Sequence, residues 1–259
     1  EKLLRNQGVA WEMASLMVRL GHEVDGMAQG KASSHCLGCV LITGVGLLIN
    51  SAFERYSSPR CLRLHSGSAL YTYWIGCTVQ LALLPALLML IVRDTAPRFA
   101  TWSLWLNAEW SQLTSPWHAL FHYVFFGYLM KDMFTPMSTV FYVHHAVCMA
   151  LTVLSLAEWP VPCSAVFVLM VMVLEFGSCA LSLSRQYPTS QLLNHLSLVV
   201  MGVSNTSAAL LAIWFGLYFG RGDTLASRWA LPMIGYGMMF GRQDLEWKRW
   251  KDHGKAHAA

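Results

Sequence analysis

This sequence contains few charged residues. Only 12% of its 259 residues are charged and 55% are hydrophobic, whereas a soluble domain carries about 25% charged residues. The formal net charge of +4 is small and dispersed, which argues against a nucleic-acid partner. Internal repeats and low-complexity tracts are also lacking, so nothing indicates a second domain. The scarcity of charge therefore predicts a membrane protein.

Long apolar runs stand where charge is missing. Several reach the roughly 20 residues that a helix needs to cross a bilayer. None shows the alternation of a barrel strand, and only helices and closed barrels satisfy their backbone in lipid. The sequence thus predicts an all-α, polytopic membrane protein with six or seven transmembrane helices. The candidate spans are residues 36–53, 69–92, 117–135, 137–156, 161–183 and 193–220, with a further one at 225–240.

The segments around these spans differ in character. Residues 1–35 form an N-terminal segment in which 9–27 have the periodicity of an amphipathic helix, lying on the membrane or against a partner. Residues 36–241 form the membrane domain, and 242–259 form a polar, basic tail. The tryptophans of 93–116 suit the headgroup region.

Two adjacent histidines, His144 and His145, lie inside the fourth predicted span. Titratable groups in hydrocarbon cost free energy, so they usually face a cavity or a partner. At about 100° per residue, one sector of this helix carries both histidines together with Cys148, Thr152 and Ser155. This segregation predicts a polar face directed towards a neighbour.

Glu175, in the fifth span, is the predicted partner of the histidine pair. Both lie about eight residues, or roughly 12 Å, from the same membrane side, and Asp132 lies about 6 Å shallower. The pattern favours a His/His/Glu cluster with Asp132 at its mouth. Such a cluster suits a structural polar network, a contact with a lipid headgroup or ligand, or catalysis or metal binding. We expect His118 and His122 to lie at the interface and not to bind metal.

These residues resemble the TLC domain family. The family pattern has a Gly-Tyr…Asp stretch on one span, a His-His pair on the next and a Glu on the span after it. Here the stretch is Gly127-Tyr128 with Asp132, followed by the histidine pair and by Glu175. The resemblance covers about residues 117–185 and implies a TLC-like helical bundle.

The ceramide synthases of that family carry a longer motif, from which this sequence departs. At the positions of its His-Asp and Ser-Asp pairs stand Phe167, Val168, Met170 and Val171, which neither transfer protons nor bind metal. The resemblance therefore implies the non-synthase branch, whose members are linked to membrane-lipid composition, lipid sensing or cargo transport. We assign no metal site and no confident catalytic residue.

Two non-catalytic functions follow from this resemblance. The protein binds or handles lipid through His144, His145, Cys148, Thr152, Ser155, Asp132 and Glu175, or it is an accessory subunit of a larger membrane complex. The alternative is a lipid acyltransferase that uses His144 or His145 as base or nucleophile. The expected ligand is a bound lipid, or a pigment within a complex. The expected partners are membrane lipids and other membrane subunits, in an intracellular or organellar membrane.

Overall fold

The computed structural model of the chain describes most of the membrane domain. The described residues are 32–57, 64–65, 68–113, 115–134, 139–156, 164–218, 233, 235–237, 239–244, 247–248 and 250–251. The predicted amphipathic helix at 9–27 and most of the predicted span at 225–240 lie outside them.

The described chain is built from helices. Their order is α2 (Ala32–Tyr56), α3 (Leu70–Thr78), the π-helical η1 (Val79–Leu83), α4 (Leu84–Thr95), η2 (Ala96–Arg98), α5 (Trp102–Leu106), η3 (Trp110–Leu113), α6 (Pro116–Asp132), α7 (Thr139–Leu156), α8 (Ser164–Gln186) and α9 (Gln191–Tyr218). The strand pairing of the described part is one short antiparallel ladder between β1 (Leu64–His65) and β2 (Ser68–Ala69). Among residues 233–251, those described are helical.

Some of these helices are long enough to span a membrane. Among the described residues, four helices are long and apolar enough to cross a membrane: His35–Tyr56, Leu70–Arg98, Ser164–Gln186 and Gln191–Leu217. Helices also form at the other two main predicted spans, but α6 has 17 residues and the apolar part of α7 covers Phe141–Val153. The prediction of an all-helical protein with apolar helices of spanning length is thus confirmed.

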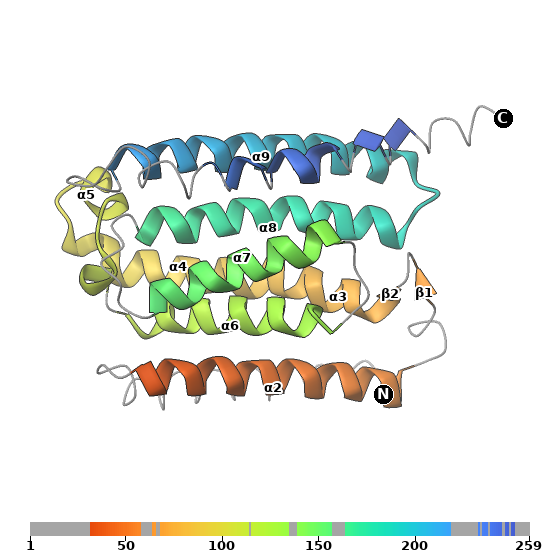
Figure 1. Cartoon of the computed structure of the whole chain (residues 1–259), viewed down its shortest axis with the longest axis horizontal. Helices are drawn as coiled ribbons and strands as arrows, with labels where there is room; N and C mark the ends of the chain where they lie inside the picture. Colours follow the sequence, from red (N-terminus) through yellow and green to blue (C-terminus); the bar gives the residue numbers. More distant parts are fainter. Residues whose placement is uncertain are drawn as a thin grey trace.

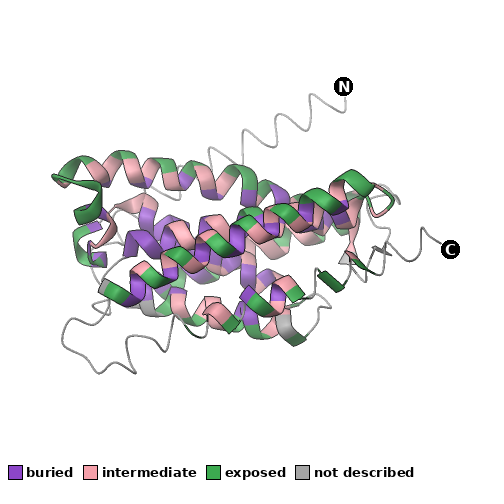
Figure 2. Ribbon diagram, turned by 90° about the horizontal axis from the view of Figure 1, so that it is seen from above, coloured by how far each residue is buried: buried purple, intermediate pink, exposed green. Residues whose placement is uncertain are grey.

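The long helices run side by side along the longest axis of the molecule, and α7 lies obliquely across them (Figure 1). Their inner faces are buried and their outer faces exposed (Figure 2). The core lies where α4, α6 and α8 meet, and Leu84, Leu113 and Phe121 are fully buried there. Exposed apolar residues such as Val40 and Leu48 on α2 face outward, as expected for a surface in contact with lipid.

The tryptophans between α4 and α6 do not all take the predicted headgroup position. Trp102 is 64% exposed, but Trp105 is 2% exposed and its Nε1–H donates to Thr95 Oγ1 at 2.8 Å. Trp110 is also buried, against His118. A buried indole needs a partner for its N–H, and Thr95 at the end of α4 provides one for Trp105. These two tryptophans therefore close one end of the bundle.

Two glycines allow helices to approach closely. A Cβ at Gly127 on α6 would lie 2.8 Å from Ile42 Cγ2 and 3.0 Å from the backbone nitrogen of Thr43 on α2. A Cβ at Gly177 on α8 would lie 2.6 Å from Ser204 Oγ on α9. Without a side chain at these positions, the Ser204 hydroxyl reaches the Val173 carbonyl at 2.6 Å. Small residues at such contacts are typical of helix packing in membranes.

Candidate functional site

The histidine pair faces two different environments. His144 and His145 are 6% and 9% exposed, and their ring centroids are 5.7 Å apart. Adjacent residues point about 100° apart around a helix, so the two rings leave α7 in different directions. His145 points towards Asp132 on α6, whereas His144 lines a cavity beside α8 and α9. The single polar face that the sequence predicts is therefore divided into two sites.

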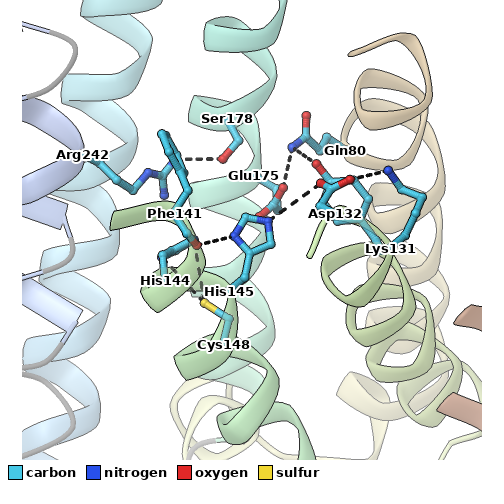
Figure 3. A network of polar contacts seen from close by, with 11 residues as sticks. Gln80, Lys131, Asp132, Phe141, His144, His145, Cys148, Glu175, Ser178 and Arg242 are labelled. Carbon is cyan, nitrogen blue, oxygen red and sulfur yellow. Dashed lines mark hydrogen bonds and ion pairs between the residues drawn. The ribbon is translucent and has the colours of Figure 1, made fainter. Parts of the chain in front are cut away.

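His145 belongs to a polar network between α6, α7 and α8 (Figure 3). Its Nδ1 lies 2.8 Å from the Phe141 carbonyl oxygen, which fixes the ring and makes Nδ1 the donor. Its Nε2 lies 3.8 Å from Asp132 Oδ2. Glu175 lies beside His145 in Figure 3 and is close enough to interact with it electrostatically. The structure thus brings together the three helices that carry the predicted cluster.

Three further polar residues join this network, and none of them is among the site residues predicted from the sequence. Gln80 donates from Nε2 to Glu175 Oε2 at 2.6 Å and to the Tyr128 hydroxyl at 3.1 Å. Lys131 is 2% exposed, pairs with Asp132 and lies over the Tyr128 ring at 5.4 Å. Gln80 lies in a π-helical turn, and such turns are frequent at functional sites, so the backbone marks this residue once the structure is known. No periodicity in the sequence reveals it.

Thr152 and Ser155 are satisfied within their own helix. The Thr152 hydroxyl donates to the Cys148 carbonyl at 2.8 Å, and the Ser155 hydroxyl donates to the Leu151 carbonyl at 2.9 Å. Such bonds from a hydroxyl to the preceding turn are usual for Ser and Thr inside helices. Both residues are buried, and this local bonding explains them without a ligand.

A cavity with a volume of about 70 Å³ lies between α7, α8, α9 and the described helical residues after 233. Its walls are mostly apolar, and the polar side chains on its lining are His144 and Arg242, with Cys148 beside His144. The Cys148 sulfur lies 3.8 Å from His144 Nε2. The lining residues are His144, Val147, Cys148, Leu151, Phe167, Met170, Val171, Leu174, Ala212, Phe215, Gly235, Met239 and Arg242.

Arg242, the first residue of the predicted polar, basic tail, is only 2% exposed. Its Nη2 donates to Ser178 Oγ at 2.8 Å and to the Leu174 carbonyl at 3.4 Å, both on α8. It also interacts electrostatically with His144 and with Glu175. Arg242 therefore belongs to the bundle and connects the cavity with the polar network.

Formal charges in this region balance when both histidines are neutral. Lys131 and Arg242 contribute two positive charges, and Asp132 and Glu175 contribute two negative ones. Buried ions need compensation: Lys131 pairs with Asp132, while Glu175 and Arg242 are each hydrogen-bonded and interact electrostatically. Guanidinium N–H groups are hydrogen-bond donors only, so a ligand beside Arg242 must offer acceptor oxygens.

The chain matches no protein-family model, no curated protein and no solved structure. The TLC-like interpretation therefore depends on the residues themselves: Asp132, the histidine pair and Glu175, in that order on three consecutive helices.

Proposed function

We propose that this protein is a TLC-like integral membrane protein of six or seven spans that binds a membrane lipid. A segment of the acyl chain lies in the cavity between α7, α8 and α9, and a carbonyl or carboxylate oxygen of the lipid accepts hydrogen bonds from Arg242. The observation that carries this proposal is the cavity, which is apolar along its walls and polar at His144 and Arg242. An amphiphilic lipid is likewise divided into an apolar chain and a polar end.

The cavity volume limits the part of the lipid that is enclosed. At 10–15 Å³ for each water-sized group, a cavity of about 70 Å³ holds on the order of five such groups. This corresponds to a short stretch of a hydrocarbon chain and not to a whole lipid. The walls away from His144 and Arg242 are apolar, so filling that part of the cavity with methylene groups is favourable.

The two shorter helices support a count of at least six spans. At 1.5 Å per residue, the 17 residues of α6 extend over about 25 Å, close to the roughly 30 Å of a hydrocarbon core. Both α6 and α7 carry polar groups that face other helices, which is where membrane helices tolerate them.

Lipid retention by the purified protein tests this proposal. Native mass spectrometry of gently solubilised protein should show a bound acyl lipid, and the variant Ala212→Leu should lose it because leucine fills the cavity. The matched control is Ala150→Leu on the exposed face of α7, which should keep the lipid. If Ala212→Leu retains as much lipid as the wild type, the cavity is not the binding site.

The polar end of the cavity has its own test. Arg242→Gln should weaken binding of a long-chain fatty acid, whereas Arg185→Gln, which removes the same charge at the end of α8, should not. Co-purification of protein neighbours without lipid would instead favour an accessory subunit of a complex.

A further inference from the structure

A second histidine pair lies in α6, away from the cavity lining. His118 and His122 are 1% and 0% exposed. They are four residues apart, so they share one face of the helix, and their ring centroids are 5.2 Å apart. Protein therefore encloses both rings.

Aromatic rings surround this pair on several sides. The Trp110 ring stacks on His118 with a centroid distance of 4.1 Å and meets His122 edge-on at 4.9 Å. Phe167 stacks on His122 at 5.6 Å, and Phe121 lies 5.8 Å from the same ring. We call these five residues the aromatic box. The box places two polar rings in apolar surroundings.

Three of the four imidazole nitrogens in the aromatic box have no hydrogen-bond partner among the described residues. His118 Nε2 lies 3.3 Å from Ser164 Oγ. Among the residues that the structure describes, no group hydrogen-bonds to His118 Nδ1 or to either ring nitrogen of His122. A buried polar atom without a partner loses its hydration and gains nothing in return, so three of them call for a ligand.

The surroundings of the box restrict the nature of that ligand. A proton shared between the rings would require a hydrogen bond joining them, and His122 makes none among the described residues. Within the described part of the chain, no group of three His, Cys, Asp or Glu side chains converges there to hold a metal ion. The solvation cost of an ion rises with the square of its charge, so a divalent ion without a carboxylate or thiolate is strongly disfavoured.

We propose that His118 and His122 bind one monovalent Cu(I) ion inside the aromatic box. Neutral imidazole is a common ligand for copper, and Cu(I) accepts as few as two donors. Ser164 orients His118 through Nε2 and leaves Nδ1 for the metal, while Trp110 contacts both rings and adds a cation–π attraction. Phe167 borders both this site and the lipid cavity, but His118 and His122 do not line the cavity, and the copper site does not depend on the proposed lipid function.

Anaerobic competition against a chromophoric Cu(I) chelator tests the site in the full-length protein. Accessible thiols are first alkylated with N-ethylmaleimide, because cysteines also bind Cu(I). Wild-type protein should bind one Cu(I) per chain, and X-ray absorption should show nitrogen ligands. His118→Ala or His122→Ala should weaken binding by more than about 100-fold, since each removes a direct ligand, and Ser164→Ala by about 10-fold. Binding should quench tryptophan fluorescence because Trp110 adjoins the metal.

His195→Ala is the matched control, since His195 lies exposed on α9 and is bonded to the Gln191 carbonyl oxygen. This variant should bind Cu(I) as the wild type does. Two results would overturn the proposal: wild-type protein that binds no more Cu(I) than the double variant His118→Ala/His122→Ala, or an absorption spectrum with sulfur ligands after alkylation. Either result leaves water as the partner of the ring nitrogens. If the double variant fails to fold, the wild-type protein alone decides the matter, because either the absence of bound Cu(I) or sulfur ligation overturns the proposal.

Discussion

Asp132 on α6 lies between a buried lysine and a histidine of the next helix. Its Oδ2 is 3.8 Å from His145 Nε2, and its other carboxylate oxygen pairs with Lys131, which is only 2% exposed. The carboxylate is thus the counter-charge that allows a lysine inside the bundle. Asp132, which the sequence predicts at the mouth of the polar cluster, therefore also stabilises the buried Lys131.

Removing this carboxylate should destabilise the fold strongly. In Asp132→Asn, Lys131 remains buried without its counter-charge, and breaking a buried pair in this way costs about 3–5 kcal/mol. The double variant Lys131→Met/Asp132→Asn should recover much of that loss, because it removes both charges. Thermal unfolding in detergent measures both variants. A double variant no more stable than Asp132→Asn would show that the ion pair is not the cause.

The sequence alone located most helices, and the reason is physical. A helix in lipid must be apolar over most of its length, so the runs at 164–186 and 191–218 can be recognised without knowing their neighbours. The same applies to the order of Asp132, the histidine pair and Glu175 along consecutive helices. Depth along an antiparallel pair follows from counting residues, and Glu175 lies beside His145 in Figure 3.

The composition of the site was less predictable, because it depends on which helix faces which. Gln80 stands alone in an apolar run and Arg242 begins a polar segment, so neither is marked by its sequence neighbours as part of the site. Both reach the site through the packing of α8 against the segments that carry them. A helical wheel shows the direction of Thr152 but not that its hydroxyl bonds to its own backbone. The aromatic box likewise requires η3 to fold back against α6.

The contact between α8 and α9 provides a sharp test of packing. Gly177→Ala should destabilise the protein by about 1–3 kcal/mol, because the new Cβ would lie 2.6 Å from Ser204 Oγ and 3.0 Å from Met201 Sδ. Gly202→Ala on α9 is the matched control, since nothing lies within 4 Å of its Cβ position. That change should stabilise the helix by about 0.5–1 kcal/mol. Equal unfolding temperatures for the two variants would contradict the close approach.

Trp105 should matter more for stability than its neighbour Trp102. Trp105→Phe loses the hydrogen bond to Thr95 and leaves a small void, which together should cost about 1–3 kcal/mol. Trp102→Phe, at a position that is 64% exposed, should change stability by no more than about 0.5 kcal/mol. Thermal unfolding followed by circular dichroism separates the two variants. A larger effect at Trp102 would mean that a partner or lipid buries that ring.

Acyl transfer is the activity that the alternative function requires, and we expect none. The positions where a synthase carries proton-transferring groups are apolar here, and three of them, Phe167, Met170 and Val171, line the cavity beside His144. His144 therefore has no neighbouring acid or base at those positions to complete a relay. Purified protein incubated with a long-chain acyl thioester and a long-chain amine should form no more amide than a protein-free control, as measured by mass spectrometry. If amide does form, and either His144→Ala or His145→Ala abolishes it, the histidine pair is catalytic and the non-catalytic proposal is wrong.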